Sequence, residues 1–201
     1  MSDERFAQDG FFVDQLIRPV VNLYRISTLG ADGASPHEPV AFVRQKRLAL
    51  KEDIRFFADE SEQEELFRIK ARQVFDVRAR YDVTMPHGER LGVLEKVFGA
   101  SLLRSTWRIY DAAEEQVALA QEKSVPIALL RRLIDFVPYG GLIPIVFQFT
   151  ILMDGRDVGE LRRPIGIRDR YILKLGGDHE RRIDRRLAVA LAIALDALQG
   201  R

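Results

Sequence analysis

The segment 187–195 reads Leu-Ala-Val-Ala-Leu-Ala-Ile-Ala-Leu, and no other part of the chain constrains the fold as strongly. Alanine is the best helix former and is depleted in strands, so the segment is predicted to be helical although large and small residues alternate in it. On a helix its three leucines fall on one side, Val189 and Ile193 fall roughly opposite, and alanines fill the stripes between them. A helix that is apolar all round must be buried all round.

A helix over 184–199 would be about 24 Å long, the height of a small barrel. The remaining chain reads as short strands, because apolar and polar residues alternate over 75–85. Similar runs occupy 22–28, 40–46, 54–58, 66–70, 91–97, 106–110, 116–121, 145–153, 156–163 and 171–175. Many short strands separated by turn residues indicate a sandwich or a barrel. A closed sheet with the helix running through its middle satisfies both observations.

Lysines recur in the middle of the chain at Lys46, Lys70, Lys96 and Lys123. Each lies where one strand ends and another β segment begins, which predicts a meander of successive hairpins. A further helix is expected over 124–137, because Ser124 is a typical N-cap and Pro126 falls in the first turn. The whole chain, 1–201, is expected to be a single domain in which 1–21 form an N-terminal extension.

Composition excludes several classes of function. The formal net charge of +1 gives no general attraction to nucleic acid, and the absence of cysteine excludes disulfides, thiolate zinc sites and a cysteine nucleophile. Residues 1–10 lack the features of a signal peptide, and no run approaches the roughly 20 apolar residues that span a bilayer. A cytoplasmic protein is expected, with peripheral contact to a membrane left open.

Five segments, in their order along the chain, resemble the tubby C-terminal-like superfamily, and most closely its LURP-one-related and phospholipid scramblase branch. They are Phe-Val-Arg-Gln-Lys-Arg-Leu-Ala-Leu-Lys (42–51), Glu-Leu-Phe-Arg-Ile-Lys (65–70), Gly-Glu-Arg-Leu-Gly-Val-Leu-Glu-Lys (88–96), Ser-Thr-Trp-Arg-Ile-Tyr (105–110) and 185–196. The resemblance extends over about 40–198. It implies a mainly β fold: a closed antiparallel barrel of about twelve strands around an apolar, central C-terminal helix.

The resemblance implies less about function. Tubby domains bind phosphoinositides through basic side chains on the barrel wall, whereas many LURP-one-related proteins have no assigned activity. Scramblases carry an acidic calcium-binding segment late in the domain, together with palmitoylated cysteines. In this chain arginines are interleaved with the acids of the corresponding stretch, 154–178, and there is no cysteine. Calcium dependence and lipid anchoring are therefore not expected.

A search for catalytic chemistry finds little. The chain contains no GxSxG, GxxxxGK[ST], GxGxxG or HExxH motif. His37, His87 and His179 occur singly, without the spacing of a metal site. Asp178-His179-Glu180 is interpreted as a polar approach to the last helix, with a proton-transfer cluster as the alternative. No enzyme activity, cofactor or metal is predicted.

Two further features each have a structural and a functional interpretation. The acidic segment 59–65 suits a solvated hairpin tip, and a cation site is its alternative. Trp107 with Tyr110, and Phe147 with Phe149, suit core packing, and stacking on a ligand is the alternative.

A basic series late in the chain is the strongest candidate for a binding site. It consists of Arg162, Arg163, Arg168, Arg170 and Lys174. Even spacing would place Arg168, Arg170 and Lys174 on one face of a continuous strand, whereas the adjacent Arg162 and Arg163 must point to opposite sides. Arginine forks suit phosphate, so Arg162, Arg168, Arg170 and Lys174 are the candidate residues for an anion or lipid headgroup. A solvated, salt-bridged face is the alternative, because acids lie close by.

The predicted function is a non-enzymatic, tubby-like binding domain for a lipid headgroup, another anion or a protein partner, and not for nucleic acid. The competing hypothesis is a scramblase-like protein that moves lipid, with the apolar residues of 127–153 inserting together with the last helix. Arg131, Arg132 and Asp135 argue against deep insertion of that stretch.

Overall fold

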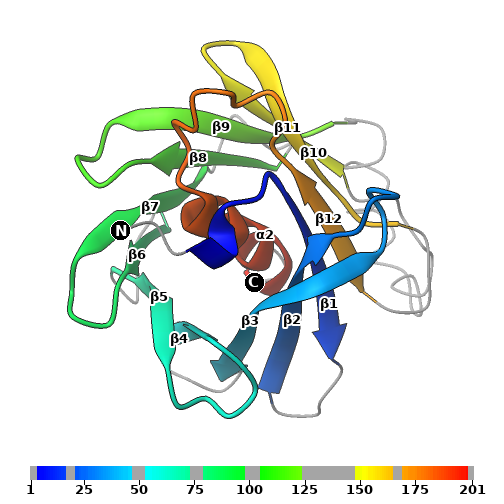
Figure 1. The fold of residues 1–201 in the computed structure, drawn as a ribbon. Helices are drawn as coiled ribbons and strands as arrows, with labels where there is room; N and C mark the ends of the chain where they lie inside the picture. The colour runs from blue at the N-terminus through cyan, green and yellow to red at the C-terminus, as the bar shows by residue number, and fades with distance from the viewer. Residues whose placement is uncertain are drawn as a thin grey trace, which may run out of the picture.

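The computed structural model describes residues 4–16, 21–46, 53–72, 79–97, 105–123, 148–164 and 169–198. Within these ranges twelve antiparallel strands form a closed barrel, in which each strand pairs with its neighbours along the chain and β1 pairs with β12 (Figure 1). This arrangement confirms the predicted barrel and the predicted meander. The strands are β1 (Gly10–Leu16), β2 (Val21–Leu29), β3 (Pro36–Lys46), β4 (Asp53–Phe57), β5 (Glu65–Ala71), β6 (Arg80–Thr84), β7 (Arg90–Val97), β8 (Thr106–Tyr110), β9 (Gln116–Glu122), β10 (Gln148–Met153), β11 (Arg156–Arg162) and β12 (Arg170–Lys174).

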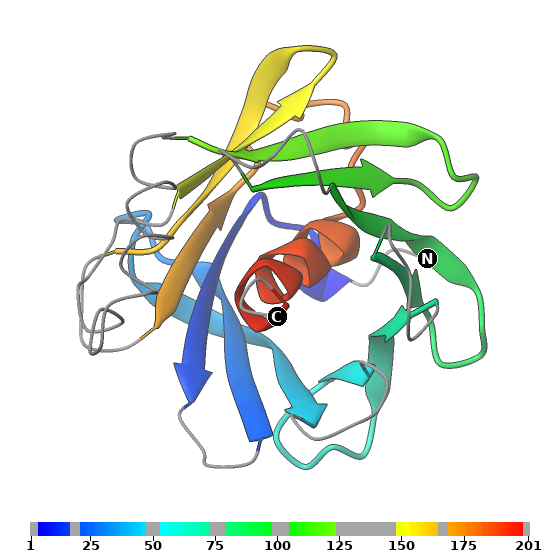
Figure 2. The ribbon, with the colours of Figure 1, turned by 180° about the vertical axis from the view of Figure 1, so that it is seen from behind.

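The helix α2 (Arg185–Ala197) runs through the middle of this barrel (Figure 2). Every residue of 187–195 is at most 1% exposed, which confirms the prediction that the segment is buried on all sides. Burying each large apolar side chain there stabilises the fold by roughly 1.5–3 kcal/mol. Asp184 caps the helix, since its Oδ1 accepts a hydrogen bond of 2.8 Å from the backbone N–H of Arg186.

The helix approaches the sheet closely at Gly92 on β7. A Cβ atom at this position would lie 2.4 Å from the carbonyl oxygen of Tyr110 and 2.7 Å from Cδ2 of Leu187 on α2. Both distances are shorter than van der Waals contact, so only glycine fits between β8 and the helix without a shift of its neighbours.

The N-terminal segment 1–21 was expected to be an extension, but it contributes β1, which closes the barrel between β2 and β12. Phe11 and Val13 face the core at 0% and 1% exposure, and Phe12, on the opposite face, is only 6% exposed. A strand buried on both faces reads as a continuous apolar run, without the alternation that marks a half-buried strand. This is why sequence periodicity did not reveal it.

Two predicted strands are tested only in part, and one predicted helix is not tested. Of the strand expected over 75–85, β6 is described from Arg80, and Ala79 just before it has a φ of 41°, outside the extended region. The helix expected over 124–137 lies outside the described residues, as does the first part of the strand expected over 145–153.

The two mouths of the barrel differ. α2 begins at the mouth where the turns 30–35, 58–64, 85–89 and 111–115 lie, and it ends at the opposite mouth. At the first mouth, Arg185 forms ion pairs of 2.6 Å with Asp178 and with Asp9. Burial alone would raise the pKa of Asp178, but hydrogen bonds from Arg185 and from the N–H groups of Ile183 and Arg182 outweigh it and lower that pKa. These contacts fix the start of the helix.

Candidate functional site

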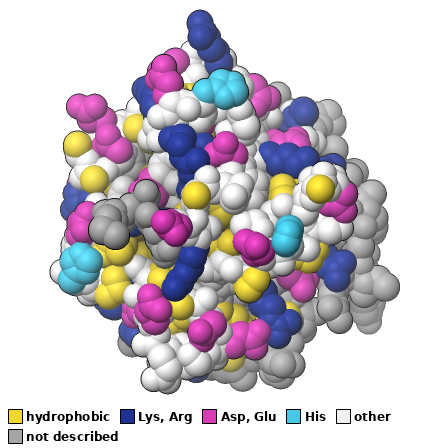
Figure 3. Space-filling model, in the orientation of Figure 1, with side chains coloured by type: hydrophobic (Ala, Val, Ile, Leu, Met, Phe, Trp, Pro, Cys, Tyr) yellow, Lys and Arg dark blue, Asp and Glu magenta, His cyan; other side chains and the backbone are white. Residues whose placement is uncertain are grey.

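The interior of the barrel is filled by α2, so the side chains that can contact a ligand lie on the outer wall and at the mouths. Basic and acidic side chains are interspersed over the face of the molecule drawn in Figure 3. A binding site on such a surface depends on local groups and not on a general field.

The predicted basic series lies on β11 and β12. Tyr171 and Leu173 face the core, so Arg170 and Lys174 lie on the outer face of β12 with Ile172 between them. Arg162 on β11 is the cross-strand partner of Ile172 and shares that face. The structure therefore brings together three of the four candidate residues, while Arg168 lies outside the described residues.

Acidic side chains accompany these three residues. Nε of Arg170 lies 3.2 Å from Oδ1 of Asp14 on β1, and Nε of Arg162 lies 4.0 Å from Oε1 of Glu160. Lys174 is the cross-strand partner of the same Glu160. Three basic and two acidic side chains give this wall a net charge of +1. It is salt-bridged and retains an excess of positive charge.

Arg163 forms an ion pair with Asp169, and its charge partly opposes the rise that burial causes in the pKa of Asp196, near the end of α2. Arg163 therefore acts at the barrel mouth and does not join the outer wall that carries Arg162, Arg170 and Lys174. This separation from Arg162 agrees with the opposite directions expected for adjacent residues.

The acids of 154–178 are engaged with nearby protein groups. Asp154 pairs with Arg182 at 2.6 Å, Asp157 accepts a hydrogen bond from the N–H of Gly159, and Asp178 pairs with Arg185. Asp178 is thus a buried anchor for the helix start, in agreement with the structural interpretation of the Asp178-His179-Glu180 cluster. Among the residues that the structure describes, no group of three or more His, Asp or Glu side chains is placed to hold a metal ion.

The acidic segment 59–65 is held by arginines of neighbouring strands. Glu60 pairs with Arg25 on β2 at 2.5 Å, and Glu62 pairs with Arg44 on β3 at 2.6 Å. The turn between β4 and β5 is therefore tied to the outer wall, although much of it is exposed as the sequence suggested.

Two of the candidate aromatic residues belong to the core. Trp107 is fully buried and stacks on Tyr81 with ring centroids 5.9 Å apart, and Phe149 is also fully buried. Tyr110 points outward, where the guanidinium of Arg80 lies 5.4 Å from its ring centroid. Phe147 lies outside the described residues.

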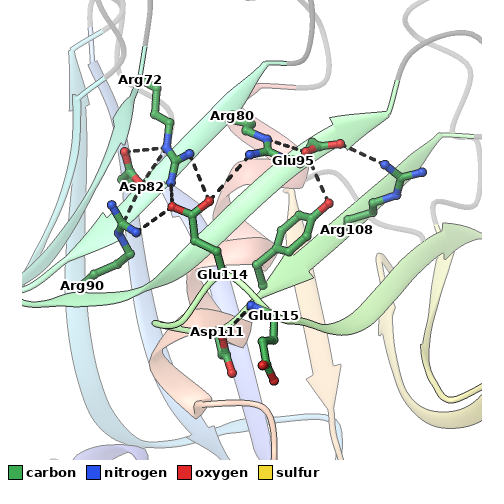
Figure 4. A network of polar contacts seen from close by, with 10 residues as sticks. Arg72, Arg80, Asp82, Arg90, Glu95, Arg108, Asp111, Glu114 and Glu115 are labelled. Atoms are coloured by element: carbon green, nitrogen blue, oxygen red, sulfur yellow. Dashed lines mark hydrogen bonds and ion pairs between the residues drawn. The ribbon is translucent and has the colours of Figure 1, made fainter.

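A network of arginines and carboxylates on the outer wall of β6, β7 and β8 was not predicted (Figure 4). It contains Arg72, Arg80, Arg90, Arg108, Asp82, Glu95 and Glu114. Glu95 is 5% exposed and accepts hydrogen bonds from Arg80 at 2.5 Å and Arg108 at 3.1 Å. The alternation of apolar and polar residues on β6 indicated an outer polar face. It could not predict which charged groups pair, because partners such as Arg72 and Glu114 are 42 residues apart in the sequence.

A second polar cluster that sequence reasoning missed lies where α2 ends. The carboxylate of Asp196 accepts hydrogen bonds from the hydroxyls of Tyr24 and Tyr171, and Nε2 of Gln15 lies 3.5 Å from the Tyr24 hydroxyl oxygen. Burial raises the pKa of Asp196, the two tyrosines oppose this effect, and the charge of Asp169 raises that pKa further.

The scramblase hypothesis requires β10 and α2 to leave the barrel. Phe149, Ile151 and Met153 of β10 face the core, as does the whole apolar run of α2, while residues 127–147 lie outside the described ranges. No described helix is long and apolar enough to cross a membrane. The described part of the structure therefore gives no support to joint insertion of these segments.

Comparison with known proteins agrees with this architecture. The family model of the LURP-one-related proteins matches residues 40–196, which include every strand from β4 onward and nearly all of α2. No curated protein and no solved structure shows a significant match. The matched region exceeds half of the chain, and the closed barrel around a C-terminal helix is the fold that the resemblance implied. The chain belongs to the LURP-one-related family, within the tubby-like superfamily.

Proposed function

We propose that this LURP-one-related domain binds an anionic group, with a phosphate-bearing lipid headgroup as the favoured ligand, on the outer wall of β11 and β12. The observation that carries the proposal is the placement of Arg162, Arg170 and Lys174 on one outer face, where the ion pairs and cross-strand partners given for these described residues involve Asp14 and Glu160. Guanidinium forks match the geometry of phosphate oxygens, and the ammonium of a lysine adds a point charge.

The occupied interior supports this choice of surface. Small barrels that bind ligands in the lumen leave room between their inward side chains, whereas α2 fills that volume here. The side chains of Arg162 and Arg170 are 42% and 49% exposed, so both guanidinium groups can reach a ligand outside the barrel. A site of this kind binds through charge and is screened by salt.

Vesicle co-sedimentation tests the proposal. Wild-type protein is mixed with zwitterionic vesicles and with vesicles containing a phosphoinositide, each at two salt concentrations. A triple variant, Arg162→Ala, Arg170→Ala and Lys174→Ala, is compared in parallel, and Arg168→Ala is tested separately. We expect wild type to prefer the anionic vesicles, the higher salt to weaken binding, and the triple variant to lose at least about tenfold in affinity, which corresponds to about 1.4 kcal/mol.

A matched control separates a site from a general charge effect. Arg44, Arg55 and Arg68 are cross-strand neighbours on the outer wall of β3, β4 and β5, and replacing all three by alanine removes the same charge elsewhere. We expect this control to bind nearly as well as wild type. Equal losses in both triple variants, or no binding by wild type, would refute the proposed site.

A further inference from the structure

The side chain of Glu114 occupies a cradle made by arginines from three places in the fold (Figure 4). Its Oε1 accepts hydrogen bonds of 2.7 Å from Arg72 and from Arg90, and its Oε2 accepts one of 3.3 Å from Arg72. Nη1 of Arg80 lies 3.7 Å from Oε2. A single carboxylate thus receives a bidentate fork from one guanidinium and faces two others.

The cradle is held in shape by carboxylates other than Glu114. Asp82 accepts hydrogen bonds of 2.8–3.0 Å from Arg72 and lies 3.6 Å from Nε of Arg90. Oε2 of Glu95 accepts a hydrogen bond of 2.5 Å from Nε of Arg80, and the same guanidinium lies over the Tyr110 ring. The arginines are therefore pre-organised by partners on the sheet itself. They keep these partners when the side chain of Glu114 turns away.

Glu114 reaches the cradle from the turn between β8 and β9. Its backbone has a φ of 64°, a left-handed conformation that is strained for a residue with a side chain. The turn does not depend on the Glu114 carboxylate, because Oδ1 of Asp111 accepts the N–H groups of Ala113 and Glu115. The side chain of Glu114 is 36% exposed, and exposed ion pairs contribute little to stability. It can therefore swing into solvent while the turn stays folded.

Charge favours another anion in its place. Four arginines and three carboxylates give the network a net charge of +1, and this rises to +2 when Glu114 turns away. Arg90 is 41% exposed, so this side of the cradle is open to a ligand from outside the barrel. We propose that the cradle of Arg72, Arg80 and Arg90 binds a carboxylate side chain from an acidic segment of a partner protein, and that Glu114 is the internal group it displaces.

The observed occupant indicates a peptide in preference to a phosphate. The group in the cradle is a carboxylate carried on a polypeptide turn, and the planar fork of Arg72 matches the planar carboxylate. The Tyr110 ring lies next to the guanidinium of Arg80, and tyrosine and arginine are residue types that are enriched at protein interfaces. This site is on a different wall from the proposed lipid site, so either can fail without the other.

The test uses the chain's own turn as the probe. A peptide with the sequence of residues 110–116, Tyr-Asp-Ala-Ala-Glu-Glu-Gln, is titrated into ¹⁵N-labelled protein while the arginine Nε–H signals are followed by NMR. Two variants vacate the cradle: Glu114→Gln, which removes the charge, and Glu114→Gly, which also suits the positive φ. Both should bind the peptide about two- to fivefold more tightly than wild type, because the internal competitor is gone and an exposed ion pair holds it only weakly.

Glu115→Gln is the matched control, since it removes the same charge from a side chain that points away from the cradle (Figure 4). This variant should bind the peptide as wild type does, while Arg90→Ala combined with Glu114→Gly should lose the binding. A peptide with glutamine in place of its first glutamate should not bind. Inorganic phosphate is titrated at the same concentrations.

Three results would overturn the inference. Equal affinity of wild type and both Glu114 variants would show that Glu114 does not compete, and absence of binding by all of them would show that there is no site. Shifts caused by phosphate but not by the peptide would assign the cradle to a phosphate group. Vesicle binding by the Glu114 variants should equal that of wild type, which keeps this test separate from that of the proposed function.

Discussion

Tyr24 on β2 donates a hydrogen bond of 2.6 Å to Oδ2 of Asp196 near the end of α2, and so joins residues 172 positions apart in the sequence. Tyr171 on β12 donates to the other carboxylate oxygen. β2 and β12 both flank β1, so the end of the helix is tied to the part of the wall that closes the barrel. At the same mouth, Nζ of Lys96 donates to the carbonyl of Leu198 at 3.2 Å and satisfies a helix-end acceptor.

Replacing Tyr24 by phenylalanine should destabilise the fold by about 1.5–3 kcal/mol, the usual worth of a hydrogen bond to a charged group. The ring remains to fill the core, so the loss reports the hydroxyl alone. Urea unfolding of Tyr24→Phe, Tyr171→Phe and the double variant measures it. A double variant whose loss equals the sum of the two single losses would show that the two hydroxyls act independently and not as one network.

The raised pKa of Asp196 predicts a specific dependence of stability on pH. In the folded state this carboxyl keeps its proton above the ordinary pKa of 3.8, so ionising it in the native protein costs free energy. Its contribution to stability is therefore fully present below the unfolded pKa and is lost as pH rises through the folded one. The groups facing it are Tyr24, Tyr171, Asp169 and Arg163.

Asp196→Asn removes this titration. The stability of wild type relative to the variant should fall as pH rises from about 3.8 toward neutrality, measured by urea unfolding at several pH values. A relative stability that stays constant, or rises, across this range would contradict the raised pKa.

The burial of α2 makes Leu191→Asp one of the most damaging substitutions possible. Leu191 is 1% exposed in the middle of the helix, and an aspartate there would be an unpaired buried charge. We expect the free energy of unfolding to fall by about 4 kcal/mol or more, measured by thermal and urea unfolding.

Removal of residues 184–201 should leave insoluble protein. A soluble truncated chain with a cooperative melting transition would show that the helix is not the core of the barrel.

Gly92→Ala tests the close approach of α2 to β7. The added methyl group would overlap the Tyr110 carbonyl oxygen and Leu187, and overpacking of this kind costs about 1–3 kcal/mol. Gly176→Ala is the control, because a Cβ there has no atom within 4 Å among those that could obstruct it. Both variants are compared by their melting temperatures, and equal values would contradict the tight contact.

Calcium should not change the melting temperature. A ligand that binds only the folded state must raise it by mass action, and the acids of 154–178 named above already pair with arginines or backbone N–H groups. Thermal scans with calcium and with a chelator test this. A calcium-dependent rise that the chelator reverses would show that these acids bind the ion.

Local periodicity is sufficient for much of this architecture. The helix at 187–195 was predictable because no polar residue interrupts its surface, and β8 was predicted with its observed bounds because apolar Trp107 and Ile109 alternate with polar neighbours. The same alternation predicted that Arg170 and Lys174 share a face. Each of these properties depends on residues within a few positions of one another.

Closure and side-chain partners required the tertiary structure. The run Phe11-Phe12-Val13 is buried on both faces because β1 closes the barrel, and no local pattern predicts a wall that forms only when the ends of the chain meet. The pairs Tyr24–Asp196 and Arg72–Glu114 depend on strand register and on where the helix ends. The sequence therefore determined which faces are apolar and which are charged. Only the closed barrel decided which charges meet, because long-range register sets their distances.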